Sequence, residues 1–408
     1  MGADHEVNPP PPYSPDVGAP VAGRSATAEE RHSFLKSASL PAGMIDEIVR
    51  SCEEFPLRIW IIDNSGSMGT SDGNRIIEAA GHEQVANCTR WTELADSLRW
   101  HSAMSAHLAA PTEFRLLNRP RGESMSQMLH CGVGPEPTSE VRAMEDMLKE
   151  LPAGMTPLCA QIRDVVQRVR RDEASLRSRG KRCLVVIASD GKASDGDVEE
   201  ALRPMLHLPV FLVVRLCTDD SEVVDYWNKV DEDLEIEMDV LDDVCSEAVE
   251  VMRKNRWLTY GVALHRLREW GSTRKVIDLL DEKTLSSEEF LDFAQLLLGR
   301  DACAELPSPI FNWEGFNAHL ERVLQQTPDV WCPVHKKRFS LTIPFSPPWP
   351  AALTVCVCVC VCVCVCVCVC VYVCAFAFVL VCVHETTRRK DCRAGKDSCV
   401  RCAWCGGS

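Results

Sequence analysis

The chain has 408 residues, of which 46% are hydrophobic and 25% are charged, a composition typical of folded globular proteins. Its 59 acidic residues outnumber its 44 basic ones, which gives a net charge of −15. Sequence-independent binding to nucleic acid depends on a basic surface, so this charge balance argues against a nucleic-acid partner. The length allows two ordinary domains, or one domain of about 200 residues with additions.

The N-terminal segment 1–30 contains the string Pro-Pro-Pro-Pro-Tyr and few residues that could form a core. We predict a disordered, proline-rich lead, because burial of so little apolar surface cannot offset the entropy of folding. The segment also has no apolar stretch like that of a secretory signal, which favours the cytoplasm as the compartment. Helical patterning begins next, in a lead-in over 31–55.

Six short apolar runs follow, and amphipathic stretches separate them. Continuous apolar character suits strands that are covered on both faces. Strands that alternate with helices indicate the α/β class, with a doubly wound, Rossmann-like and mostly parallel sheet flanked by helices over 56–254. The predicted strands are 57–62, 113–117, 128–133, 183–188, 210–216 and 234–241, and the predicted helices are 91–109, 139–151, 157–177, 197–206 and 220–230.

A smaller α-helical appendage is predicted over 255–340, where helical patterns alternate with short connections. Gly271 and Gly299 follow the ends of two such patterns and are expected to stop the helices. Four tryptophans are expected to be core anchors of this part, namely Trp257, Trp270, Trp313 and Trp331.

The segment 351–383 is a low-complexity repeat in which Val and Cys alternate. It is long and apolar enough for a membrane span, although alternating β-branched Val is a poor choice for a helix. A single strand of this length would be an aggregation hazard. We favour a third explanation, translation of a GT dinucleotide repeat, since the codons GTG and TGT alternate in such a repeat.

The 23 cysteines form two groups along the chain. Nine are scattered before residue 350, and fourteen lie in the last 54 residues. The nine lie mostly in apolar runs, as small hydrophobic residues of a reduced intracellular protein do. In the tail 384–408, three cysteines follow a Cys-x2-Cys-x2-Cys pattern. Because no histidine or partner module accompanies that pattern, we predict no zinc site in the tail.

A group of oxygen-bearing side chains follows the first predicted strand. The sequence there has the form Asp-x-Ser-x-Ser, with Asp63, Ser65 and Ser67 at alternate positions. The carboxyl ends of strands in open α/β sheets are where ligands bind. One carboxylate and two hydroxyls suit a hard divalent cation such as Mg2+, which prefers oxygen ligands.

This motif resembles the metal-ion-dependent adhesion site of von Willebrand factor A domains. The resemblance covers about half of the chain and implies two more site residues from later loops, which Thr156 and Asp190 provide in the expected order. It implies that Ser65 and Ser67 bind the ion directly, Thr156 directly or through water, and Asp63 and Asp190 largely through water. The ion would be Mg2+, or Mn2+ or Ca2+, with one position open to an acidic group of a partner protein.

Each residue also has a simpler structural explanation. Asp63 and Ser65 could form an Asx-turn, Thr156 could cap the helix that begins at Pro157, and Asp190 could only end a strand. Five such residues in the right order make a joint coincidence improbable. We interpret two nearby acidic residues, Asp195 and Asp197, as helix caps rather than ligands.

We therefore expect a non-enzymatic module that binds an acidic group (Asp or Glu) of a partner protein through a divalent cation. No catalytic constellation is evident in the sequence. One alternative is a membrane-anchored receptor or adhesion protein that uses 351–383 as its span. Another alternative is a non-catalytic subunit that recruits substrate to an enzyme complex.

Overall fold

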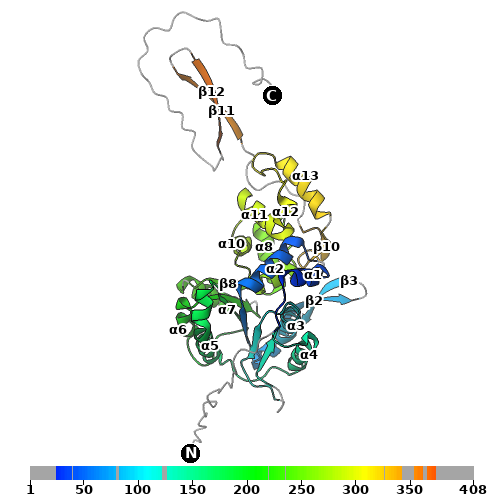
Figure 1. Ribbon diagram of the computed structural model, residues 1–408, viewed down its shortest axis with the longest axis vertical. Helices are drawn as coiled ribbons and strands as arrows, with labels where there is room; N and C mark the ends of the chain where they lie inside the picture. The colour runs from blue at the N-terminus through cyan, green and yellow to red at the C-terminus, as the bar shows by residue number, and fades with distance from the viewer. Residues whose placement is uncertain are drawn as a thin grey trace, which may run out of the picture. The chain divides into compact units, whose positions relative to one another are not determined.

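The computed structural model describes residues 24–341, except 39, 80–81, 122–125, 219, 235 and 326, and the backbone of 353–361 and 365–373. The chain divides into two compact units, 1–349 and 350–408 (Figure 1). The proline-rich string near the N-terminus and the tail 384–408 lie outside the described residues.

A six-stranded sheet lies at the centre of the first unit, with the strand order β5-β4-β1-β6-β7-β8. Neighbouring strands are parallel, except that the edge strand β5 pairs antiparallel with β4. The predicted α/β class, with a mostly parallel, doubly wound sheet, is confirmed. The strands are β1 (Leu57–Ile62), β4 (Thr112–Leu116), β5 (Met128–Cys131), β6 (Cys183–Ser189), β7 (Val210–Leu216) and β8 (Met238–Leu241).

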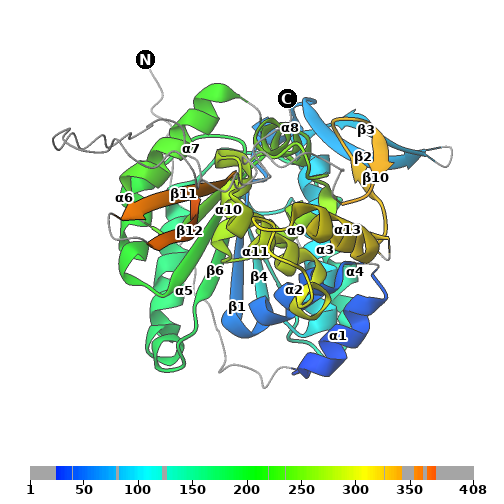
Figure 2. The ribbon, with the colours of Figure 1, turned by 90° about the horizontal axis from the view of Figure 1, so that it is seen from above.

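Separate hydrophobic cores bury the two faces of the sheet, because successive side chains of a strand point in opposite directions. In β1, Ile59 and Ile61 belong to the core under α5, α6 and α7, whereas Trp60 and Ile62 belong to the core under α3 and α4. Figure 2 shows these helices on opposite sides of the strands. Their bounds are α3 (Arg90–Leu108), α4 (Pro137–Leu148), α5 (Leu158–Ser178), α6 (Val198–Leu202), which the 3-10 helix η2 (Arg203–His207) follows, and α7 (Ser221–Asp233).

Helices from both ends of the first unit build a third core. The lead-in helix α2 packs against α11, and Gly43 allows this approach because a Cβ atom there would lie 2.3 Å from the carbonyl oxygen of Leu296. Trp257 and Trp270 are buried in this core as predicted, and Trp313 packs against it. The helices are α1 (Ala28–Lys36), α2 (Ala42–Glu54), α8 (Val244–Lys254), α9 (Val262–Glu269), α10 (Lys275–Glu282), α11 (Ser287–Leu298), α12 (Arg300–Cys303) and α13 (Trp313–Leu324).

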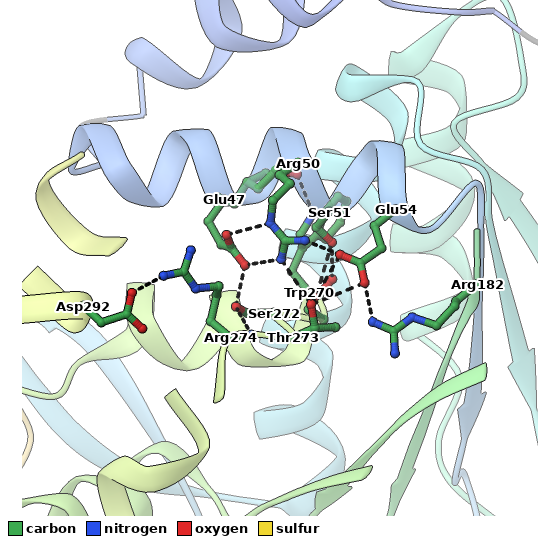
Figure 3. Close-up of polar contacts among 12 residues, drawn as sticks. Glu47, Arg50, Ser51, Glu54, Arg182, Trp270, Ser272, Thr273, Arg274 and Asp292 are labelled. Atoms are coloured by element: carbon green, nitrogen blue, oxygen red, sulfur yellow. Dashed lines mark hydrogen bonds and ion pairs between the residues drawn. The ribbon is translucent and has the colours of Figure 1, made fainter. Parts of the chain in front are cut away.

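Polar contacts join α2 to the loop between α9 and α10 (Figure 3). The guanidinium of Arg50 donates to both carboxylate oxygens of Glu47, at 2.9 and 2.5 Å, and Ser272 Oγ donates to the same carboxylate at 2.6 Å. Ser51 Oγ donates to the carbonyl oxygen of Trp270 at 3.0 Å. These bonds hold the lead-in helix and the predicted helical appendage together as one helical layer.

A buried carboxylate attaches this layer to the sheet domain. Glu269 of α9 is fully buried and accepts hydrogen bonds from Ser97 Oγ at 2.8 Å and His101 Nε2 at 3.0 Å, both on α3. Arg266 also donates to it, at 2.6 Å. Burial lowers the pKa of His101 to about 4, so the ring is neutral at pH 7 and serves as a core hydrogen-bond donor.

Two antiparallel hairpins were not predicted. The first pairs β2 (Gly73–Ala79) with β3 (His82–Cys88), and the second pairs β9 (Val330–Cys332) with β10 (Lys337–Phe339). An ion pair of 2.6 Å between Arg338 and Glu83 connects the two hairpins.

The second unit contains two strands of the Val-Cys repeat, β11 (Leu353–Val361) and β12 (Val365–Val373), which pair antiparallel. The described part of the repeat therefore forms two paired strands rather than one long strand. Within the parts of the chain that the structure describes, no helix combines the length and the apolar character that a membrane span needs.

Candidate metal site

The predicted Asp-x-Ser-x-Ser segment lies directly after β1, which has parallel neighbours on both sides. Asp63 and Ser65 are buried, and Ser67 is exposed within the short 3-10 helix η1 (Gly66–Gly69). Asp190 follows β6, the next strand in the sheet, and is 4% exposed. Because β1 and β6 are parallel, their carboxyl ends bring both carboxylates to the same edge.

Hydrogen bonds connect four of the five predicted residues. Ser65 Oγ and Ser67 Oγ lie 2.9 Å apart, and Ser67 Oγ donates to Asp190 Oδ1 at 2.9 Å. Asp63 Oδ1 accepts the backbone N–H of Ser65 at 2.8 Å, and Ser189 Oγ donates to Asp63 Oδ2 at 2.6 Å. Burial raises the pKa of Asp63, while the hydrogen bonds from Ser189 and Ser65 oppose that rise. The Asp63 carboxylate is thus held in one orientation behind the two serines.

Thr156 belongs to a loop that is tied to this group through its backbone. The N–H of Gly66 donates to the carbonyl oxygen of Gly154 at 3.0 Å, and the N–H of Ala153 donates to that of Asn64 at 2.8 Å. Gly154 has a φ of +102°, and a Cβ atom there would lie 2.7 Å from Asn118 Oδ1. Only glycine suits this position, so the loop conformation that carries Thr156 depends on it.

Thr156 is not the cap of the following helix, which was one alternative explanation for it. Helix α5 begins at Leu158, and its first free N–H groups, on Cys159 and Ala160, donate to the carboxylate of Asp195 at 3.0 and 2.8 Å. Asp197 caps α6 by accepting from Glu199 N at 2.9 Å. The prediction that Asp195 and Asp197 are caps is confirmed. Thr156 instead bonds Ser194 through its own backbone N–H, which donates to Ser194 Oγ at 3.2 Å.

A cationic side chain that the sequence analysis did not identify contacts the site. Arg90, the first residue of α3, donates to Asp190 Oδ2 at 2.9 Å and to both carboxylate oxygens of Asp72, at 2.7 and 2.5 Å. These carboxylates raise the pKa of Arg90, so it stays charged. Arg90 lies 100 residues from Asp190 in the chain, and no local pattern could have indicated the pairing.

Three other contributing residues also escaped the sequence analysis. Ser189 holds Asp63, and its place immediately before Asp190 at the end of a predicted strand was the available signal. Asn64 and Asn118 join the β1 loop to the segment after β4, since Asn118 N donates to Asn64 Oδ1 at 2.8 Å and Asn64 Nδ2 donates to the Asn118 carbonyl at 3.0 Å. Their pairing has no signature in the sequence, because it depends on the sheet order.

The side chains present fit a hard divalent cation. The group offers the hydroxyls of Ser65 and Ser67 and the carboxylate of Asp190, whose two oxygens accept from Ser67 and Arg90, with Asp63 behind them, and all of these ligand atoms are oxygens. Over the described residues, no three His, Cys, Asp or Glu side chains gather in a way that could hold a metal ion. The group formed by the carboxylates of Asp63 and Asp190 and the hydroxyls of Ser65 and Ser67 is of a different kind, and with so few carboxylates a bound cation would still attract an external one.

The surface beside this group is apolar and hollow. Leu151 and Met155, in the loop that carries Thr156, are 77% and 69% exposed, which is unusual for large hydrophobic side chains. A neighbouring cavity of about 370 Å3 is lined in part by Arg119 and Arg121. Leu151 and Glu150 line the same cavity, and so does Asn64, which lies between Asp63 and Ser65 in the chain.

No protein-family model and no curated protein matches this sequence. Among solved structures, the chain is similar to the pilus adhesin SpaC from Lactobacillus rhamnosus GG, with 13% identity and a TM-score of 0.32. The similarity covers 55% of this chain and 31% of the adhesin, so the chain matches less than a third of that protein's length.

Proposed function

We propose that this protein is a metal-ion-dependent protein-interaction module of the von Willebrand factor A type. In this proposal Asp63, Ser65, Ser67, Thr156 and Asp190 hold Mg2+, and the bound ion attracts a carboxylate of a partner protein. The observation that carries it is the hydrogen-bonded series from Ser65 through Ser67 to Asp190, with both bonds 2.9 Å long, at the carboxyl edge of the sheet.

A protein partner is favoured over a small molecule by the surroundings of the site. Leu151 and Met155 present apolar surface next to the oxygen ligands, and exposed apolar side chains of this kind are typical of protein contact surfaces. Arg119 and Arg121 outnumber Glu150, the acidic residue of the same cavity lining, and their net positive charge suits an acidic partner segment. The rest of the chain is acidic, so this local charge would help to orient the partner.

The cytoplasm is the compartment that we propose. In the described part of the chain, nine cysteines are free thiols, and seven of them are buried. Secreted proteins usually pair such cysteines in disulfides, whereas reducing compartments keep them as thiols. Compartment-specific labelling of the native protein would test this part of the proposal.

Removal of single oxygen ligands is expected to weaken binding of Mg2+. We expect Ser67→Ala and Asp190→Asn to lower the Mg2+ affinity of the full chain by at least about tenfold each. Ser67 is exposed, so its variant should keep the stability of the wild type. Isothermal titration calorimetry with MgCl2 measures the affinity, and circular dichroism confirms the fold.

A matched control is Asp225→Asn, which makes the same charge change at an exposed position of α7. It should bind Mg2+ as the wild type does. Equal Mg2+ affinity in wild type, Ser67→Ala and Asp190→Asn would contradict the site assignment.

Arg90 should act against the bound cation. Its guanidinium occupies Asp190 Oδ2, so a metal ion that uses this carboxylate must overcome repulsion from a fixed positive charge. We expect Arg90→Met to raise Mg2+ affinity by about tenfold at low ionic strength, with a smaller gain at high salt because ions screen the repulsion. The same titration at two salt concentrations measures it. Unchanged binding would contradict the expected repulsion, and weaker binding would show that Arg90 supports the site instead.

A further inference from the structure

A cavity of about 530 Å3 lies where β2 of the first hairpin, helix α3 and the end of β7 meet helices α8 and α9. All of these elements belong to the first unit of the chain. None of the five predicted metal-site residues lines this cavity, so it is separate from the proposed Mg2+ site. Sites for small molecules usually have volumes of about 300–1,000 Å3, and this cavity falls within that range.

Arginines from four different elements line the cavity. The four are Arg75 of β2, Arg99 of α3, Arg215 of β7 and Arg266 of α9. Two acidic residues, Glu93 and Asp96, share the lining with them. Carboxylate and phosphate groups match the planar fork of a guanidinium, so an excess of arginine over acidic residues in a cavity favours an oxyanion as its ligand.

The ion pairs within the protein leave part of this hydrogen-bonding capacity unused. Arg75 and Arg99 share one carboxylate, that of Asp96, to which they donate at 2.8 and 3.0 Å. Arg99 Nε also donates to a carboxylate outside the lining, and Arg266 Nη1 donates to the buried Glu269. Among the described residues, no acceptor is bonded to Arg75 Nη1, Arg99 Nη2 or Arg266 Nη2. Three guanidinium groups of the lining can therefore each donate to a ligand.

Two polar atoms of more deeply buried lining residues also lack a hydrogen bond within the described part of the chain. They are Arg215 Nε and His265 Nε2, in side chains that are 2% and 1% exposed. Both lie near Glu269 Oε1, at 3.4 and 3.6 Å, without bonding to it. Buried polar atoms without partners are uncommon because each costs free energy, so their presence in this lining favours a ligand that has polar atoms of its own.

Apolar side chains complete the lining. They are Ile76, Trp100, Val244 and Val262. None of them is fully buried, and Val262 is 36% exposed. An ion-pair network that only stabilises the fold would explain the arginines, but it would not explain apolar side chains left uncovered beside them. A ligand with an apolar body would cover this surface.

We propose that this cavity binds a small organic anion, in which a carboxylate or a phosphate is attached to an apolar body. Arg75 and Arg266 donate to the anionic head, and Trp100 and Val262 contact the body. The site needs no metal ion, and it adds a small-molecule ligand to the proposed protein-interaction function.

Calorimetric titration of the full chain with 1-naphthyl phosphate and with 1-naphthoate tests the proposal. EDTA in the buffer removes divalent cations, so neither probe can bind through a metal at the Mg2+ site. We expect saturable binding of at least one probe, and the probe that binds more tightly identifies the head. The head alone, as inorganic phosphate or acetate, and the uncharged body alone, as 1-naphthalenemethanol, should each bind at least about tenfold more weakly.

Two variants locate the bound probe. Arg75→Gln removes a contact to the head, whereas Val262→Phe fills part of the cavity and keeps every arginine. Each should lower the affinity for the probe by at least about tenfold. Neither residue is buried, so both variants should keep the fold, which circular dichroism checks.

Arg170→Gln, at an exposed position of α5, is the matched control and should bind the probe as the wild type does. Ser67→Ala, which alters the proposed Mg2+ site, should also leave this affinity unchanged. No saturable binding of either probe would overturn the proposal. Equal affinities of wild type, Arg75→Gln and Val262→Phe would overturn it as well, because the anion would then bind elsewhere on the chain.

Discussion

Replacement of Arg268 by methionine is expected to lower the free energy of unfolding by about 3–5 kcal/mol at pH 7, the usual cost of removing one partner from a buried ion pair. Arg268 of α9 is only 1% exposed. It donates to Asp239 of β8 at 2.9 Å and to Asp281 of α10 at 3.1 Å, and it also pairs with Glu247 of α8. Methionine fills a similar volume, but it leaves three carboxylates without their shared cation.

The loss should depend on pH in a specific direction. Burial already raises the pKa of Asp239 and of Glu247 in the folded protein, and removal of Arg268 raises both further. A carboxyl whose pKa is higher in the folded chain stabilises the fold below its unfolded pKa, and this stability is lost as pH rises through the folded pKa. The deficit of the variant should therefore be larger at pH 7 than at pH 5.

Urea unfolding followed by circular dichroism at the two pH values measures both effects. Arg170→Met, at an exposed position of α5, is the matched control and should change the free energy of unfolding little. A deficit below about 1 kcal/mol, or one that stays the same at both pH values, would show that Arg268 does not stabilise these carboxylates.

The second large effect concerns Asp242, which follows β8 and lines a cavity of about 240 Å3. Burial and the nearby carboxylates of Glu250 and Asp243 raise its pKa to about 7. The same causes, burial and then Asp278 first among its acidic neighbours, raise the pKa of Asp231 across the cavity to about 6. Arg268 is the cationic side chain that lines this cavity, and it is already engaged in ion pairs with Asp239 and Glu247. The acidic lining residues are Asp231, Asp239, Asp242, Glu247, Glu250, Asp278, Asp281 and Glu282.

Asp242→Asn is therefore expected to stabilise the protein at alkaline pH. An unfolded aspartate ionises near pH 4, so between about pH 4 and pH 7 the wild type should lose stability relative to Asp242→Asn, as the folded state resists ionisation of Asp242. A pKa difference of about three corresponds to roughly 4 kcal/mol, and partial solvent contact reduces the expected gain at pH 8 to about 2–4 kcal/mol. Thermal unfolding from pH 4 to pH 8 measures the change.

The exposed Asp225→Asn serves as the control here too, and its unfolding should follow the pH dependence of the wild type. The Asp242 variant and the wild type should be most nearly equal in stability near pH 4, where Asp242 is still uncharged in the folded protein. A stability difference between Asp242→Asn and the wild type that does not grow between pH 4 and pH 7 would refute the interpretation of this cavity.

Much of the sheet could be predicted because its strands are buried on both faces. The run Leu57–Ile62 became β1 without a change of bounds, and Val210–Leu216 became β7. The last strand is shorter than the predicted 234–241, since Leu234 still serves as the C-cap of α7. At this point the apolar residues at the end of the helix come just before those of the strand. Hydrophobic periodicity alone therefore does not show where the helix ends and the strand begins.

The hairpins could not be predicted for a related reason. β2 and β3 are mostly half-buried on both faces, so their residues show no alternation of apolar and polar side chains. β9 and β10 have three residues each, which is too short for any period to be recognised.

Local patterns were enough to indicate the α/β class and to select Asp63, Ser65 and Ser67, and the family resemblance added Thr156 and Asp190. The structure connects four of these five residues by hydrogen bonds, while their role as metal ligands stays a prediction. Tertiary packing was needed for every contact between distant segments. It places Arg90 on Asp190, ties Thr156 to the site through its backbone, and joins α2 to α11. Such contacts depend on strand order and helix packing, which follow from the free energy of the whole fold rather than from any local pattern.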